Sequence, residues 1–130
     1  MSNAAMVKGL YEAAGRGEPG VLMGALHPSI EWREADGSPY AGGNPYVGPD
    51  AVGQLLGRIS TDIAGFRLEP QTFTDGGDVV LMQGRYKGTV ATTRKPFDAA
   101  FAHVWYVRDG KVVRFQQYTD TKQWTDVLGS

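Results

Sequence analysis

The chain contains no cysteine. Disulfide bonds, cysteine-ligated zinc, iron–sulfur clusters and thiol nucleophiles are therefore excluded. The chain also has no excess of positive or negative charge. It contains 13 lysines and arginines and 14 aspartates and glutamates, which gives a net charge of -1. A protein that holds nucleic acid through its phosphates needs a basic surface, so we expect no nucleic-acid partner.

Long apolar runs are absent as well. No stretch approaches the roughly 20 apolar residues that cross a bilayer, and the first residues lack the basic and apolar regions of a signal peptide. We therefore expect a cytoplasmic protein with no membrane partner. The length predicts a single domain over residues 1–130. Residues 1–5 are expected to be disordered or to come from a purification tag.

Glycine, by contrast, is abundant, with 18 of 130 residues, about twice the usual share of roughly 7%. The glycines are spread through turns and strands, which indicates bends and open space rather than a linker. Two of them flank Tyr86 in a predicted strand, and we expect them to leave room for a ligand there.

The N-terminal third is predicted to be helical. Apolar residues recur at helical spacing up to Ala14, and Gly15 ends this helix. A second short helix starts at Pro19 and ends before His27-Pro28. A third helix opens at Gly48-Pro49 and runs to about residue 62.

The second half alternates between apolar and polar residues, which predicts strands. We expect a short early strand over residues 30–34, a loop over 35–48, and long strands over 66–74, 79–90, 97–108 and 111–119. Asp109-Gly110 predicts a tight hairpin turn between the last two, and a final helix covers residues 122–128 with Asp120 before it as its N-cap. Helices first and antiparallel strands last is the α+β pattern.

Strand periodicity predicts which side chains share the inner face of the sheet. The apolar members are Trp32, Phe101, Trp105 and Phe115, with Val113 on the last strand. The polar exceptions on this face are Glu34, Tyr86, His103 and Gln117. An apolar hollow with a few convergent polar groups is the usual form of a small-molecule site.

The opposite face of the two last strands does not look like a solvent face. It combines Ala100, Ala102, Val104 and Tyr106 with Arg114, Gln116 and Tyr118. We predict that this surface forms a sheet-to-sheet contact in a homodimer.

The order of elements and several segments together resemble the nuclear transport factor two-like superfamily, in its SnoaL-like, ketosteroid-isomerase-related branch. The segments are Ile30-Glu31-Trp32, Gly48-Pro49-Asp50-Ala51-Val52, Phe101-Ala102-His103-Val104-Trp105 and Asp109-Gly110-Lys111-Val112-Val113-Arg114-Phe115. The resemblance covers roughly residues 6–128. It implies a cone-shaped, curved antiparallel sheet packed on N-terminal helices, usually in a homodimer, but no single activity.

The resemblance also implies roles for individual residues. Glu34 matches the carboxylate that shuttles the proton in ketosteroid isomerases, and His103 matches the acid that holds the substrate oxygen. These enzymes also use a tyrosine from the first helix, where the matching position is Leu10 and Tyr11 stands one residue away. In limonene-epoxide hydrolases an Asp-Arg-Asp set does the work, and Gly84, Tyr86 and Gln117 stand at those places, so that activity is not expected.

The residues therefore predict a cavity for a small apolar ligand. The resemblance implies that this ligand is a carbonyl or polyketide-like molecule and that the protein transfers a proton on it, as an isomerase, cyclase or dehydratase does. Glu34 and His103 are the predicted catalytic residues, and Trp32, Tyr86, Phe101, Trp105, Phe115 and Gln117 are the predicted ligand contacts. Two distant histidines have no recognisable metal-ligand spacing, so neither a metal nor an organic cofactor is expected. Two alternatives stay open, a binding module without catalysis and a dimerisation domain whose own side chains fill the cavity.

Overall fold

The computed structural model describes residues 1–129. It contains four α-helices and six strands. The helices are α1 (Asn3–Gly15), α2 (Pro19–Ala25), α3 (Pro49–Asp62) and α4 (Thr121–Leu128), and the strands are β1 (Leu26–Arg33), β2 (Tyr46–Val47), β3 (Ile63–Gly76), β4 (Val79–Val90), β5 (Pro96–Arg108) and β6 (Lys111–Thr119). The predicted α+β class is confirmed.

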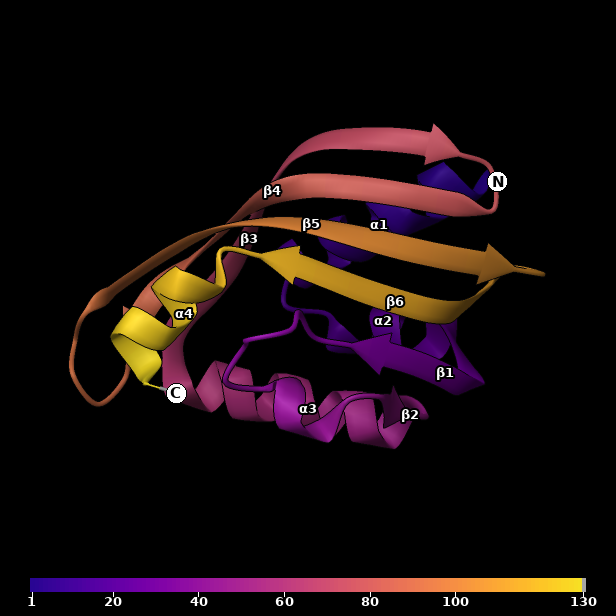
Figure 1. Ribbon diagram of the computed structural model, residues 1–130. Helices are drawn as coiled ribbons and strands as arrows, with labels where there is room; N and C mark the ends of the chain where they lie inside the picture. The colour runs from indigo at the N-terminus through magenta and orange to yellow at the C-terminus, as the bar shows by residue number, and fades with distance from the viewer. Residues whose placement is uncertain (130) are drawn as a thin grey trace.

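All six strands form one sheet in the order β2-β1-β6-β5-β4-β3 (Figure 1). The predicted antiparallel sheet is corrected at one position, because β1 runs parallel to β6. A parallel pair needs a long crossover connection, and the chain from β2 to β5 supplies it. The early strand thus lies beside the last one, which brings Trp32 next to Phe115.

The sheet is strongly curved because the pairing of β3 with β4 is irregular. This pairing is interrupted between Ala64 and Arg67 and again between Pro70 and Thr72. Gly84 and Gly88 lie opposite these irregularities, and a Cβ at Gly84 would overlap the carbonyl oxygen of Glu69. The space predicted for a ligand beside Tyr86 is therefore taken by the β3 backbone. The two glycines permit close approach at bulges, which bend a sheet.

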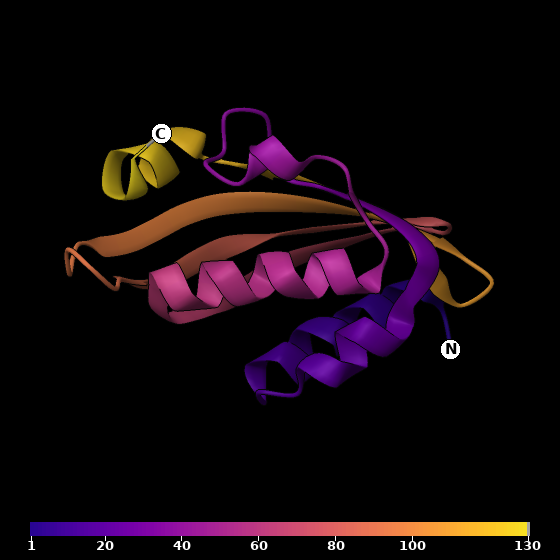
Figure 2. The ribbon, with the colours of Figure 1, turned by 90° about the horizontal axis from the view of Figure 1, so that it is seen from below.

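Helices α1, α2 and α3 lie on the same side of the sheet (Figure 2). Helix α3 begins where the sequence predicts, after Gly48, whose φ of 87° favours glycine, and with proline at its first position. Its buried residues Val52, Leu55 and Ile59 follow helical spacing. This apolar stripe packs α3 against the sheet.

Several predicted boundaries change. Helix α2 ends at Ala25, and His27-Pro28 belongs to β1 rather than to a helix end. The proline is tolerated because pairing with β6 is irregular between Leu26 and Glu31. Residues 3–5 belong to the stretch expected to be disordered or to come from a purification tag. They form the first turn of α1, with the Ser2 side chain accepting a hydrogen bond from the Ala5 amide.

On β6 the inward residue is Val112 and not the predicted Val113. Val107 pairs with Val112 while Tyr106 pairs with Arg114, so Val113 is the extra residue of a bulge. Val112 is fully buried, whereas Val113 is half-buried. From Phe115 onward the predicted inner face is correct.

Helices α1, α2 and α3 leave the outer face of β5 and β6 uncovered (Figure 2). Ala102, Val104 and Tyr106 are half-buried there, and Tyr118 is 59% exposed. Within residues 1–129, none of the helices combines the length and the apolar character that crossing a membrane requires.

Candidate functional site

A cavity of about 490 Å³ lies between the inner face of the sheet and the helices. Its inner wall is made of aromatic and polar side chains: Tyr11, Trp32, Glu34, Tyr86, His103, Trp105, Phe115, Gln117 and Trp124. Its rim is formed by exposed residues at the end of α1, the start of α2, the end of α3 and the start of β3, namely Gly15, Gly17, Glu18, Pro19, Ser60 and Arg67. The cavity therefore opens to solvent between the helices.

Glu34 stands one residue beyond β1 and is 2% exposed. The side chain of Asn44 makes two hydrogen bonds to the backbone of Glu34. The Glu34 amide donates to Asn44 Oδ1 over 2.9 Å, and Asn44 Nδ2 donates to the Glu34 carbonyl oxygen over 2.8 Å. This pair of bonds extends the strand geometry by one residue and keeps the carboxyl on the same side as Trp32.

The Glu34 carboxyl has one hydrogen-bond donor and no cation beside it. Trp32 Nε1 donates to Oε2 over 3.2 Å, and no salt bridge among residues 1–129 includes Glu34. Burial raises the pKa of Glu34 to about 7, and the Trp32 bond lowers it only in part. A buried carboxyl with this pKa can both accept and return a proton near neutral pH.

His103 lies at the centre of β5, is 3% exposed and has both ring nitrogens engaged. Tyr11 Oη lies 2.6 Å from Nδ1, and Tyr86 Oη lies 2.5 Å from Nε2. Both imidazole nitrogens are thus already hydrogen-bonded to tyrosine hydroxyls, although the ring lines the cavity. A hydrogen bond from this cluster to a ligand would therefore come from a tyrosine hydroxyl.

Two further side chains fix the outer ends of this network. Trp105 Nε1 donates to Tyr11 Oη over 2.8 Å, and Gln117 Nε2 donates to Tyr86 Oη over 2.8 Å. The other end of the Gln117 amide accepts from the backbone amide of Ala35 over 3.1 Å. The described residues contain no buried side-chain nitrogen or oxygen without a partner, so this polar cluster is satisfied in an apolar surrounding.

The network carries no charge. Burial lowers the pKa of His103 to about 3, so its imidazole is neutral at pH 7. Burial also raises the pKa of Tyr11 and, together with the nearby Glu34 carboxyl, that of Tyr86. Both phenols therefore keep their protons and act as neutral hydrogen-bonding groups.

Stacked and edge-on rings form the apolar wall. Trp32 stacks on Phe115 with ring centroids 3.7 Å apart, and Trp105 meets both at steep angles. Phe101, a predicted ligand contact, does not line the cavity. It stacks on His103 at 4.1 Å and packs against Tyr86 at 4.4 Å, so it supports these two side chains.

Of the predicted site residues, the cavity thus gathers Trp32, Glu34, Tyr86, His103, Trp105, Phe115 and Gln117. Tyr11 and Trp124 also line the cavity but were not among the predicted site residues. For Tyr11, the resemblance to ketosteroid isomerases had placed the matching tyrosine position one residue away, at Leu10. The spacing of Tyr11 was the available signal, because Val7, Leu10 and Tyr11 are buried on one face of α1. A tyrosine inside such a stripe needs a partner for its hydroxyl, and that partner is His103.

The loop between β1 and α3 does not lie at the rim. None of the described residues 35–48 lines the cavity. The loop is instead tied to α3, because Tyr40 Oη donates to Asp62 and Arg58 donates to Tyr46 Oη. The stretch Gly42-Gly43-Asn44-Pro45 positions Glu34 through Asn44.

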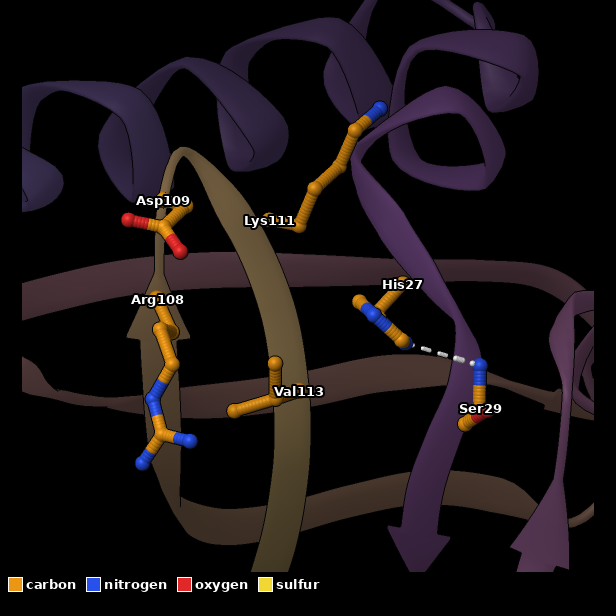
Figure 3. A pocket seen from close by; sticks show the side chains of 6 residues that line it. All are labelled: His27, Ser29, Arg108, Asp109, Lys111 and Val113. Atoms are coloured by element: carbon orange, nitrogen blue, oxygen red, sulfur yellow. Dashed lines mark hydrogen bonds between the residues drawn. The ribbon is translucent and has the colours of Figure 1, made fainter.

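A second hollow, of about 380 Å³, lies beside the β5–β6 hairpin (Figure 3). Its side chains include Arg108 and Lys111, which point away from one another in Figure 3. The Lys111 ammonium donates to the carbonyl oxygen of Gly24, and His27 accepts from the Ser29 amide. These groups do not converge, and all but Val113 are exposed, so we place the candidate site in the larger cavity.

Comparison with known proteins agrees with this fold. The family model of the SnoaL-like domain matches residues 7–115. An NTF2-like (nuclear transport factor two-like) protein from Burkholderia thailandensis E264 is 34% identical, with 98% of each chain covered and a TM-score of 0.92. An NTF2-like protein of unknown function from Burkholderia pseudomallei K96243 is 30% identical over 100% of each chain, with a TM-score of 0.88.

A third solved structure shares the fold at lower identity. TerC, co-crystallized with polyporic acid, is 24% identical over 98% of each chain, with a TM-score of 0.84. No curated protein matches the chain.

Proposed function

The chain belongs to the SnoaL-like domain family of the NTF2-like superfamily, and on that premise we propose that it binds a small carbonyl compound and moves a proton on it. Glu34 is the base in this proposal. Tyr11 or Tyr86 donates a hydrogen bond to the carbonyl oxygen, and Trp32, Trp105 and Phe115 enclose the apolar part of the ligand.

One observation carries the proposal. A buried carboxyl without a cationic partner and two neutral phenols line the same cavity, each group coming from a different element. A pKa of about 7 leaves a large fraction of Glu34 ionised at neutral pH while keeping it a useful base. Ionised groups are rarely buried without compensation, so such a carboxyl points to a chemical role.

The chemistry follows from these groups. Glu34 takes a proton from the carbon beside the carbonyl, and the C–H electron pair forms the C=C bond of an enolate. The carbonyl oxygen gains negative charge, and a phenolic O–H that is already in place stabilises it. The protonated Glu34 then returns the proton to carbon, at the same or another position, so that proton and charge balance.

The size of the cavity supports a ligand over a filled core. Small-molecule sites usually measure roughly 300 Å³ or more, and this cavity measures about 490 Å³. TerC, a protein of the same fold, was co-crystallized with polyporic acid. We therefore favour a ligand-binding cavity over the alternative of a purely structural dimerisation domain.

The experiment follows exchange of α-protons in a simple ketone. The probe is 2-tetralone, an apolar bicyclic ketone, incubated with the protein in D₂O and followed by proton NMR. We expect the wild-type protein to accelerate exchange, with a rate that rises with pH and levels off above about 7, where Glu34 is ionised. Glu34→Gln should reduce the acceleration at least a hundredfold, within the usual contribution of a general base of about 10²–10⁴.

Glu31→Gln is the matched control, because Glu31 lies on the same strand but is exposed and near Arg33. It should leave the rate unchanged. Equal exchange in wild type and Glu34→Gln would remove Glu34 from the mechanism. Binding of 2-tetralone without any acceleration over buffer would favour the second candidate, a binding module without catalysis.

A further inference from the structure

We infer that the tautomer of His103 decides which of two tyrosines presents a hydrogen-bond donor to the cavity, so that Tyr11 and Tyr86 never do so together. His103 is then a positioning residue. The inference deepens the proposed function, on which its ligand class rests, but the hydrogen-bond network itself does not depend on catalysis.

The outer ends of the network have fixed polarity. An indole nitrogen can only donate, so Tyr11 Oη accepts from Trp105. The Ala35 amide can also only donate, so it fixes the oxygen end of the Gln117 amide, and the nitrogen end must donate to Tyr86 Oη. Each phenol oxygen therefore accepts one hydrogen bond whose direction is fixed, Tyr11 from Trp105 and Tyr86 from Gln117.

The protons between these ends can then be counted. A neutral imidazole carries one N–H and one bare nitrogen, and each nitrogen faces a phenol. The two hydrogen bonds to the ring use one imidazole proton and one phenolic proton. Two phenols bring two protons, so one phenolic O–H is left over for a partner outside the network.

Two arrangements satisfy this count. When His103 Nδ1 carries the proton, it donates to Tyr11, Tyr86 donates to Nε2, and the O–H of Tyr11 is free. When Nε2 carries the proton, it donates to Tyr86, Tyr11 donates to Nδ1, and the O–H of Tyr86 is free. In both arrangements the other phenol keeps one lone pair. Both tyrosines line the cavity, so it presents one donor and one acceptor in either state.

A complementary ligand carries one carbonyl oxygen and one hydroxyl, as a hydroxy-ketone or the enol of a dicarbonyl compound does. The carbonyl accepts from the free phenol and the hydroxyl donates to the other. Exchanging the two positions on the ligand requires only that the tautomer of His103 change.

Nitrogen-15 NMR of histidine side chains tests the network directly. In the wild-type protein at pH 7 we expect one protonated and one bare nitrogen on His103. This holds whether the two tautomers interconvert slowly or rapidly on the NMR timescale. His27 is exposed and serves as an internal reference in the same spectrum. A doubly protonated His103 would overturn the inference, and this measurement requires no variant.

Two variants should fix opposite tautomers. Tyr11→Phe leaves nothing to accept from Nδ1, so the proton is expected on Nε2, where Tyr86 accepts it. Tyr86→Phe is expected to place the proton on Nδ1 for the converse reason. Buried N–H groups without a partner are rarer in proteins than acceptors without one, and we expect this preference to drive each shift. Tyr118→Phe is the control, because Tyr118 lies on the outer face and should not alter the His103 signals. The same tautomer in both cavity variants would overturn the inference.

Binding tests the ligand class. We expect the wild-type protein to bind 6-hydroxy-2-tetralone about fivefold more tightly than 2-tetralone, the gain of one net hydrogen bond. The double variant Tyr11→Phe/Tyr86→Phe should bind the two probes equally. An undiminished preference in that variant would contradict the assigned donor and acceptor. Since the NMR and binding results require no turnover, they can fail or succeed independently of the proton-transfer assay.

Discussion

Tyr11 Oη lies 2.6 Å from His103 Nδ1 although 92 positions separate the two residues in the chain. This contact joins the first helix to the centre of the sheet, and Trp105 completes it by donating to the same hydroxyl. The imidazole lies between two phenols and is neutral because it is buried, while Glu34, the only carboxyl on the cavity's inner wall, stands just beyond the end of β1. Separating the base from the donors in this way suits a ligand that bridges them.

The stability of the protein should depend on pH through Glu34. Its pKa is about 7 in the folded state and about 4.3 in an unfolded chain. The folded state binds more protons at Glu34 between these values, so Glu34 by itself should lower the free energy of unfolding by ~4 kcal/mol in total as pH rises from about 4 to 8. His103 acts in the opposite direction between about pH 3 and 6.5, because burial lowers its pKa to about 3 in the folded state. Urea unfolding at several pH values measures this.

The matched variant in that experiment is Glu34→Gln, which cannot ionise. It should lose the Glu34 contribution and keep that of His103, so its free energy of unfolding should gain ~4 kcal/mol on that of wild type between pH 4 and pH 8. Glu31→Gln should follow the wild-type curve, because Glu31 is exposed. A difference between wild type and Glu34→Gln that does not change with pH would contradict a raised pKa at Glu34.

Gln117→Leu should destabilise the protein. The substitution removes the acceptor of the Ala35 amide and the donor to Tyr86. Leaving the buried amide of Ala35 unpaired costs about 1–3 kcal/mol. Gln116→Leu, one residue earlier and half-buried on the outer face, should change the denaturation midpoint much less. Equal midpoints for the two variants would contradict the role of Gln117.

Gly84→Ala should destabilise the protein although alanine is small. The new methyl group would press on the carbonyl oxygen of Glu69 and on the Phe101 ring, an overpacking cost of about 1–3 kcal/mol. Gly57→Ala in the exposed part of α3, where nothing lies within 4 Å of the new Cβ, should instead stabilise by ~0.5–1 kcal/mol. Thermal unfolding of the two variants should show changes in stability of opposite sign. A stabilised Gly84→Ala would refute the close approach of the β3 backbone to Gly84.

We predict that a second copy of the chain covers the outer face of β5 and β6. Light scattering at micromolar concentration should give the mass of a dimer. Ala102→Asp places a charge in the centre of this half-buried face and should yield monomers, whereas Ala91→Asp, on an exposed turn, should not. A monomeric mass for the wild-type protein would refute the prediction.

The sequence by itself determined the features that depend on neighbouring residues. Asp109 and Gly110 turn the chain with φ values of 51° and 74°, as their residue types predict. Asp120 caps α4 by accepting from the Gln123 amide. Alternation along β5 placed His103 and Trp105 on one face because side chains in a strand have a period of two.

Only the tertiary structure decided which of these side chains meet. The distance between Tyr11 and His103 depends on how α1 packs across the sheet. The periodicity of a helix or strand cannot predict it. Phe101 and Trp105 share a face of β5, yet only Trp105 lines the cavity, because Phe101 stacks on His103 and packs against Tyr86. Residue types fix periodicity over a few positions, whereas a cavity is the space that distant elements leave between them.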